Sequence, residues 1–198
     1  MENLKKWIRS NWSTLILVIV FIILLVSPDA KAWLMRQVAS TGFLNSSISE
    51  PKTKEKNTES ASSYNFTLQN EEGKMISLSE LKGRVVFINF WASWCPPCRA
   101  EFPSVQRFYE KYRSKPEIIF LTVNLDDNPV SGKKYLTEKG FTLPFLIPAG
   151  SIPKEIYDGT LPTTVVLDKQ GEIRLHHKGL ADYSKESFYK QIDQLLNQ

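Results

Sequence analysis

The spacing of hydrophobic positions changes several times between residue 64 and the end of the chain. Apolar and polar residues alternate in 64–68 and return in 75–78, and a nearly continuous apolar run then follows in 85–90. Alternation is typical of a half-buried strand, whereas a continuous run indicates a strand buried on both faces. A second continuous run occupies 117–123. These segments predict a hairpin followed by two central strands.

Helical spacing follows each of the two central strands. Apolar residues recur every three or four positions in 96–113 and in 130–139, and Gly140 closes the second segment. We expect a short extended piece at 144–147, two strands around the turn 168–171, and an amphipathic helix at 184–197. The order strand–helix–strand implies parallel pairing through right-handed crossovers. The pattern therefore predicts an α/β fold, a mixed sheet with helices on both faces.

The beginning of the chain has a different pattern. Residues 12–28 form an uncharged run of 17 residues, which is close to the lower limit for a helix that crosses a bilayer. Basic residues precede this run, and the positive-inside rule then keeps the N-terminus in the cytoplasm. A cleaved signal peptide is the alternative, because the tripeptide Ala-Lys-Ala at 30–32 resembles a cleavage site. Both interpretations place the rest of the chain outside the cytoplasm.

Composition divides the chain into four parts. We assign 1–11 to a cytoplasmic N-terminus, 12–28 to a transmembrane anchor, 29–63 to a juxtamembrane segment and flexible linker, and 64–198 to a globular domain. Residues 45–63 contain almost no apolar side chain, so they cannot bury enough surface to offset the entropy of ordering. From residue 64 onward, 17 basic and 16 acidic residues nearly cancel. The domain therefore lacks the basic stripe of a protein that binds nucleic acid.

The only two cysteines, Cys95 and Cys98, lie in the segment Asn-Phe-Trp-Ala-Ser-Trp-Cys-Pro-Pro-Cys-Arg at 89–99. A structural disulfide here would close a very short loop and would stabilise the fold little. A zinc site needs four ligands, and the only histidines, His176 and His177, would point to opposite faces of a strand. Redox catalysis is the third role, and it is favoured by position. Cys95 is expected at a helix N-terminus, where free N–H groups and the helix dipole stabilise a thiolate.

This placement suits thiol–disulfide exchange. A thiolate at Cys95 would attack a disulfide, and Cys98, one helical turn later, would be buried and would resolve the mixed disulfide. The segment Phe-Trp-Ala-Ser-Trp-Cys-Pro-Pro-Cys-Arg-Ala-Glu-Phe-Pro resembles the thioredoxin superfamily and, within it, the TlpA/ResA-like membrane-anchored thiol-disulfide oxidoreductases. The resemblance covers 64–198. It implies a thioredoxin-like mixed sheet flanked by helices, an N-terminal β-hairpin extension and a separate transmembrane helix.

A second segment supports the resemblance. Residues 157–171, Tyr-Asp-Gly-Thr-Leu-Pro-Thr-Thr-Val-Val-Leu-Asp-Lys-Gln-Gly, are similar to the family's cis-proline segment and the hairpin that follows it. By this match Pro162 would be cis and would face the sulfur of Cys95, and Leu161 would offer its backbone to a bound substrate. Trp94 is expected beside the site, packed against substrate, and Trp91 in the core.

One position departs from thioredoxin itself. Thioredoxin has a buried aspartate where this chain has Asn89, which cannot titrate. TlpA/ResA-like proteins instead carry a glutamate after the second cysteine, and Glu101 matches it. Glu101 shares a helical face with Cys98, so we expect it to be partly buried, to have a raised pKa and to exchange a proton with a cysteine thiol. Arg99 is expected to be solvated.

The resemblance favours a protein-disulfide reductase tethered to a bacterial cytoplasmic membrane by a single pass, with its catalytic domain on the extracytoplasmic or periplasmic side. Its partners would be oxidised proteins, for example apocytochrome c, and an upstream membrane thiol donor of electrons. A net oxidant or isomerase is one alternative, and a copper- or metal-binding module is an alternative of another class. A peroxiredoxin is disfavoured because no Thr-x-x-Cys sequence precedes Cys95. The exchange chemistry needs no cofactor and no metal beyond the cysteine pair.

Overall fold

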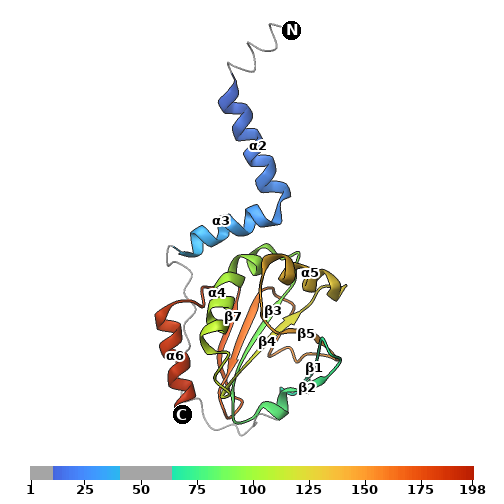
Figure 1. Cartoon of the computed structure of the whole chain (residues 1–198), viewed down its shortest axis with the longest axis vertical. Coiled ribbons are helices and arrows are strands. Elements are labelled where there is room, and N and C mark those ends of the chain that lie inside the picture. Colours follow the sequence, from blue (N-terminus) through green and yellow to red (C-terminus); the bar gives the residue numbers. More distant parts are fainter. Residues whose placement is uncertain (1–10, 41–63) are drawn as a thin grey trace.

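The computed structural model describes residues 11–40 and 64–198 of the 198-residue chain. Two helices, α2 (Trp12–Val26) and α3 (Pro28–Ser40), precede an α/β domain, as Figure 1 shows. The cytoplasmic N-terminus predicted for 1–11 lies almost wholly outside the described residues, and so does the linker predicted for 45–63.

A seven-stranded mixed sheet forms the centre of the domain, in the order β2-β1-β5-β4-β3-β6-β7. The central strands β3 and β4 are parallel, and β6 and β7 extend the sheet antiparallel on one side. On the other side, β5 pairs parallel with β4 and antiparallel with β1. The piece predicted only as extended is therefore the strand that joins the β1–β2 hairpin to the sheet. The strands are β1 (Thr67–Asn70), β2 (Met75–Ser77), β3 (Val85–Trp91), β4 (Ile118–Asn124), β5 (Phe145–Pro148), β6 (Thr163–Leu167) and β7 (Ile173–Lys178).

The helices α4 (Pro96–Tyr112), α5 (Pro129–Lys139) and α6 (Glu186–Leu196) cover one face of the sheet. Phe102 of α4, Leu136 of α5 and Ile192 of α6 belong to one hydrophobic cluster. The opposite face is covered by the 3-10 helix η1 (Leu78–Leu81) and by apolar residues of 152–157. The prediction of helices on both faces is therefore wrong, apart from this single 3-10 turn. Both crossovers, β3–α4–β4 and β4–α5–β5, step in the same direction along the sheet, and right-handed crossovers of that kind place their helices on one face.

β3 is the strand that carries the chain into the cysteine segment. All seven of its residues are buried, and they alternate between the two clusters, with Phe87 on the helical face and Ile88 on the other. Packing on both faces fixes the position of its last residue, Trp91, four residues before Cys95. The continuous apolar run in the sequence thus predicted the most deeply buried strand correctly.

The two N-terminal helices differ from the domain in their exposure. The side chains of α2 are apolar and mostly exposed around the whole helix. The chain bends by 95° between α2 and α3, near Ser27. Within the described residues no single helix is long and apolar enough to cross a membrane, although α2 and α3 taken together as one bent segment meet the same criteria of length and composition.

Gly132 of α5 is packed directly against the end of β4. A Cβ at this position would lie 2.3 Å from Nδ2 of Asn124, which itself donates to Oδ2 of Asp126 at 2.7 Å and so cannot easily move aside. We expect Gly132→Ala to lower the free energy of unfolding by about 1–3 kcal/mol, although alanine is the better helix former. Gly150→Ala, where a Cβ meets nothing within 4 Å, should change it by less than about 0.5 kcal/mol. Urea denaturation measures both variants, and equal stabilities would contradict the close packing.

Candidate active site

Cys95 and Cys98 form a disulfide at the first turn of α4, with their Cα atoms 5.3 Å apart. Cys95 is the N-cap residue, and the backbone N–H of Cys98 donates to Sγ of Cys95 at 3.3 Å. Pro96 and Pro97 take the first two helical positions, where no N–H is needed for the helix. The predicted place of Cys95 at a helix N-terminus is confirmed.

Both cysteines are buried in the oxidised protein. Cys95, the N-cap residue, is 3% exposed, and Cys98, inside the first turn, is fully buried. In the reduced protein the N–H of Cys98 and the first turn of α4 would stabilise negative charge on Cys95. The arrangement therefore suits Cys95 to attack the disulfide of another molecule. Cys98, buried in the first turn, is suited to attack Cys95 next and release that molecule.

Glu101 is buried on the helix that begins at the disulfide, with 1% of its surface exposed. Nδ2 of Asn89 donates to its Oε1 at 2.7 Å, and the backbone N–H of Ala181 donates to its Oε2 at 3.3 Å. Burial raises the pKa of Glu101 to about 8, although both hydrogen bonds act to lower it. The expected burial and raised pKa are confirmed, and the burial is more complete than predicted. At neutral pH this side chain holds a proton close to the cysteine pair.

Other residues around Glu101 were not assigned from the sequence. The amide of Asn89 on β3 also donates to Oγ1 of Thr164 on β6, at 2.9 Å. The side chain of Asn89 is therefore fixed by both Glu101 and β6. Tyr183 is fully buried; burial raises its pKa well above the usual value, and the charge of Glu101 raises it further. The sequence did single out Asn89, because it replaces the buried aspartate of thioredoxin. Tyr183 lies in an irregular segment without a motif, so nothing in the sequence pointed to it.

The peptide bond between Leu161 and Pro162 is cis, as the resemblance implied. Phe90 of β3 pairs with Thr163 of β6, so the register of the sheet places Pro162 beside the point where β3 ends and the cysteine segment begins. Leu161 is half-buried and Pro162 is buried. Trp94, next to Cys95, is 62% exposed, whereas Trp91 is in the core as predicted. The structure thus places the cis-proline beside the end of β3 and an exposed indole next to Cys95 in the chain. That Pro162 faces the Cys95 sulfur, and that Trp94, Leu161 and Pro162 bind substrate, stay predictions.

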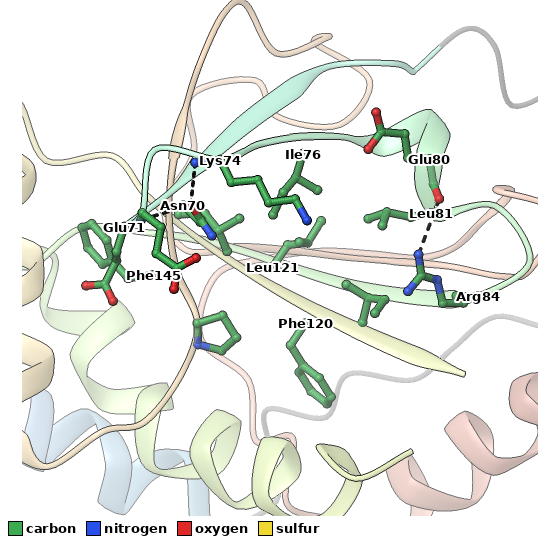
Figure 2. Close-up of a pocket in the computed structure, with 14 residues that line it drawn as sticks. Asn70, Glu71, Lys74, Ile76, Glu80, Leu81, Arg84, Phe120, Leu121 and Phe145 are labelled. Atoms are coloured by element: carbon green, nitrogen blue, oxygen red, sulfur yellow. Dashed lines mark hydrogen bonds between the residues drawn. The ribbon is translucent and has the colours of Figure 1, made fainter. Parts of the chain in front are cut away.

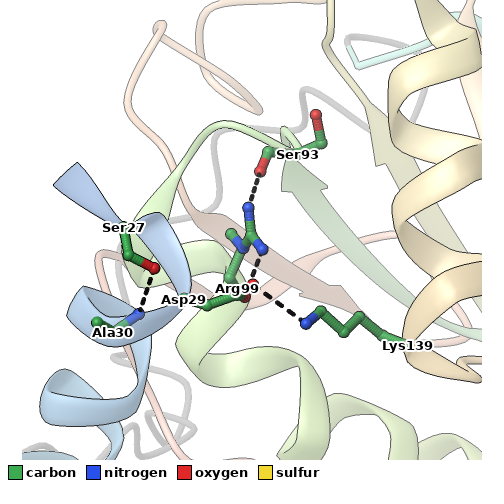
Figure 3. Close-up of polar contacts among 6 residues, drawn as sticks. All are labelled: Ser27, Asp29, Ala30, Ser93, Arg99 and Lys139. Carbon is green, nitrogen blue, oxygen red and sulfur yellow. Dashed lines mark hydrogen bonds and ion pairs between the residues drawn. The ribbon is translucent and has the colours of Figure 1, made fainter. Parts of the chain in front are cut away.

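Arg99, immediately after Cys98, is not solvated. Its side chain is 14% exposed, and its guanidinium lies 4.7 Å from the centre of the Tyr135 ring. Nη1 donates to the carbonyl oxygen of Ser93 at 3.2 Å, and Nη2 pairs with Asp29 of α3 (Figure 3). The prediction of a solvated arginine was wrong. The partners of Arg99 come from α3 and α5, which are distant in the sequence, so no local pattern could predict them.

Asp126, just after β4, anchors the loop that leads to Cys95. Its carboxylate accepts from the backbone N–H of Ser93 at 3.0 Å, from the Ser93 hydroxyl at 2.8 Å and from Nδ2 of Asn124 at 2.7 Å. Asp126→Ala removes the acceptor of three donors, so we expect the free energy of unfolding to fall by about 2–3 kcal/mol. Asp127→Ala, at the exposed neighbouring position, should have little effect. Chemical denaturation compares them, and a stable Asp126→Ala protein would show that the loop does not depend on this carboxylate.

A hollow of about 560 Å³ lies elsewhere, between the β1–β2 hairpin, η1 and the strands β4 and β5 (Figure 2). Its apolar lining includes Ile76, Leu81 and Leu121, and charged residues such as Lys74, Glu80 and Arg84 surround it. None of the residues predicted for the site lines this hollow. It is therefore separate from the disulfide.

The two histidines occupy adjacent positions of β7. His176 is exposed, and His177 is half-buried with Nε2 3.4 Å from the carbonyl oxygen of Leu180. Across residues 11–40 and 64–198, no three His, Cys, Asp or Glu side chains gather in a way that could hold a metal ion.

Comparisons with known proteins agree with this geometry. The sequence pattern of the AhpC/TSA family matches residues 61–176. Thiol-disulfide oxidoreductase ResA of Halalkalibacterium halodurans is 32% identical over 130 residues, which are 65% of this chain and 73% of that protein. ResA of Bacillus subtilis is 32% identical over 121 residues, covering 61% of this chain and 67% of its own length.

Solved structures show the same fold. A crystal structure described as a thiol:disulfide interchange protein DsbE from Chlorobium tepidum matches with a TM-score of 0.57 and 32% identity, over 67% of this chain and 93% of that chain. StoA from Bacillus subtilis matches with a TM-score of 0.53 and 29% identity, over 66% and 95% of the two chains. The domain has a thioredoxin-like α/β fold, and the chain belongs to the AhpC/TSA family of the thioredoxin superfamily as a ResA-like thiol-disulfide oxidoreductase.

Proposed function

We propose that this oxidoreductase works as a protein-disulfide reductase, tethered to the bacterial cytoplasmic membrane with its catalytic domain on the extracytoplasmic side. The observation that carries the proposal is the Cys95–Cys98 disulfide at the N-terminus of α4, with the carboxyl group of Glu101 buried on the same helix. A disulfide at a helix N-terminus supplies the two sulfurs that exchange two electrons with a substrate disulfide. A buried carboxyl group nearby can carry the proton of the internal thiol.

Exchange proceeds in two steps from the reduced protein. The thiolate of Cys95 attacks one sulfur of the substrate disulfide, which forms a mixed disulfide and releases the other substrate sulfur as a thiolate. Cys98 then loses its proton and attacks Sγ of Cys95, which releases the second substrate thiolate. Two electrons have passed to the substrate, and the protein is left with the disulfide found in this structure.

Glu101 handles the proton of the internal thiol. The ionised form of Glu101, the minor form at neutral pH, takes the proton from Cys98 in the second step. Because burial raises the pKa of Glu101 to about 8, the oxidised protein then keeps that proton at neutral pH. The proton returns to Cys98 when an upstream donor reduces the disulfide again. Asn89 fixes the orientation of the carboxyl group through its bond to Oε1.

Substrate binding is assigned to Trp94, next to Cys95, and to Leu161 and Pro162, just before β6. The backbone of Leu161, before the cis-proline Pro162, would pair with an extended segment of the oxidised partner, and the exposed ring of Trp94 would pack against it. Oxidised extracytoplasmic proteins, apocytochrome c among them, are the proposed substrates, and a membrane thiol protein is the proposed donor. A donor is needed because that compartment is oxidising.

The membrane anchor is proposed for residues 12–28. Support comes from the apolar side chains around the whole of α2, from the uncharged run of 17 residues and from the basic residues that precede it. The tether would raise the effective concentration of Cys95 near partners in the same membrane. Extraction of membranes with alkaline carbonate tests the anchor, because a peripheral chain would be released.

The direction of the reaction is tested by the reduction potential of the Cys95–Cys98 pair in the full chain, equilibrated with dithiothreitol or glutathione buffers in detergent. A value near or below roughly −250 mV is expected for a reductase. A value between about −180 and −120 mV would instead make the protein an oxidant or isomerase. A solution structure described as a protein disulfide isomerase from Bacteroides thetaiotaomicron, with 26% identity and a TM-score of 0.57, makes this the relevant alternative. If no two-electron couple titrates, binding of copper or another metal should be assayed next.

A further inference from the structure

Helix α3 has two different faces, and one of them is docked beside the active site. Asp29, Ala32 and Arg36 follow one another at spacings of three and four residues and therefore share a face. Ala32 is buried, Nε of Arg36 donates to the carbonyl oxygen of Ala100 at 3.4 Å, and Asp29 pairs with Arg99. This face of α3 thus packs on the first turns of α4.

Asp29 is the centre of this contact. One carboxylate oxygen pairs with Arg99, and the other lies 3.1 Å from Nζ of Lys139 at the end of α5 (Figure 3). Burial acts to raise the pKa of Asp29, but hydrogen bonds from Lys139 and Arg99 outweigh it and hold that pKa below the usual value. Because Arg99 also binds the carbonyl of Ser93, one chain of contacts runs from α3 to the loop that holds Cys95.

The other side of α3 carries apolar side chains, together with Lys31 at about 260° from Ala32. Leu34 and Val38 are one turn apart and lie about 200° and 240° around the helix from Ala32, counted at 100° per residue. They are 47% and 53% exposed, and Trp33 beside them is 57% exposed. We call the surface formed by Leu34 and Val38, with Trp33 at its edge, the outer face of α3.

The position of α2 indicates what covers this outer face. α2 leaves the start of α3 at 95° and points away from the domain, so α3 lies between α2 and the sheet in Figure 1. If α2 crosses a bilayer, α3 lies flat at the surface of that bilayer, with its outer face toward the lipid and its inner face on the domain. A helix with an apolar side, a tryptophan at the edge of that side and a lysine beside it is suited to that interface.

We propose that α3 is an interfacial adapter, which binds the extracytoplasmic lipid surface through its outer face and the catalytic domain through Asp29. This inference rests on the membrane anchor of the proposed function and extends it. The adapter holds Arg99, and with it the Cys-Pro-Pro-Cys turn, directly under the membrane surface. The partners it favours are therefore those whose disulfide lies one helix diameter, ~10–12 Å, from the bilayer surface, and not those deep in the extracytoplasmic space.

The lipid contact is tested with the full chain in nanodiscs of phosphatidylcholine and phosphatidylglycerol, in a Trp7→Phe, Trp12→Phe background. Lipids brominated near the headgroup end of the acyl chain should quench Trp33 by about half, if α3 lies at the depth of an interfacial helix. The signal of Trp33 is the difference between this protein and its Trp33→Phe variant, so that Trp91 and Trp94 cancel. Leu34→Glu should abolish the quenching.

The docking contact is tested by tryptic cleavage after Arg36 in the same discs. Asp29→Asn should speed this cleavage about five-fold, which corresponds to the loss of surface ion pairs, whereas Asp29→Glu should stay near the wild-type rate. Glu71→Gln breaks the ion pair with Lys133 elsewhere on the domain and is the matched control, with no change expected. An unchanged rate in Asp29→Asn would overturn the docking role of Asp29.

The outcomes separate this inference from the anchor. A chain that stays in the discs and resists carbonate, but whose Trp33 is not quenched, would overturn the adapter while the anchor stands. A chain that leaves the discs would overturn both the anchor and the adapter. Neither outcome affects the redox assignment of Cys95 and Cys98, which the reduction potential tests separately.

Discussion

Cys98→Ser is expected to trap a covalent complex with a disulfide-containing partner, whereas Cys95→Ser should form none. In the structure Cys95 is the N-cap residue of α4 and is 3% exposed, whereas Cys98, inside the first turn, is fully buried. The first attack therefore needs Cys95, and only the release of substrate needs Cys98. Either replacement should lower steady-state reduction by at least about a thousand-fold, because the two sulfurs act as one unit.

The measurement is non-reducing gel electrophoresis and mass spectrometry of each variant, reduced and then mixed with an oxidised model peptide. The Cys98→Ser complex should dissociate when dithiothreitol is added. The double variant Cys95→Ser/Cys98→Ser is the matched control and should trap nothing. A complex that forms with Cys95→Ser, through Cys98, would reverse the assigned roles of the two sulfurs.

Glu101→Gln is expected to make the oxidised protein more stable than the wild type at alkaline pH. Burial raises the pKa of Glu101 from 4.5 to about 8, so the folded state binds more protons than the unfolded state between these values. The free energy of unfolding must therefore fall as the pH rises through this window. Below it both states are protonated and no penalty exists; above it both are ionised and the fall levels off. The full difference corresponds to roughly 5 kcal/mol.

Urea denaturation at a series of pH values from 4 to 9 measures this effect. The wild-type curve should decline across the window, and the Glu101→Gln curve should lack most of that decline, so the two should separate by a few kcal/mol at pH 9. Glu110→Gln, at an exposed position farther along α4, is the control and should follow the wild type. Parallel curves for wild type and Glu101→Gln would show that the buried glutamate does not hold the proton.

The sequence alone determined the parts of this protein that depend on neighbouring residues. The apolar runs predicted both central strands, because a strand buried on both faces needs apolar residues at every position. The segment 89–99 predicted the place of Cys95 at a helix N-terminus, since proline suits only the first turn of a helix. The resemblance added the cis bond before Pro162 and the role expected of Glu101, both of which depend on motifs within short segments.

Tertiary structure decided which distant residues meet. Arg99 and Asp29 are 70 positions apart and Glu101 and Ala181 are 80 apart, so no local period predicts these contacts. The same holds for the layers. α4 and α5 share one face because the strand order β3-β4-β5 sends both crossovers the same way, and α6, after β7, packs on that face too. The spacing of apolar residues does not predict strand order. Spacing determines which side of an element is buried. Which other element covers that side is decided only when the whole chain packs. The hydrophobic effect is non-directional, so any apolar surface of suitable shape could cover it.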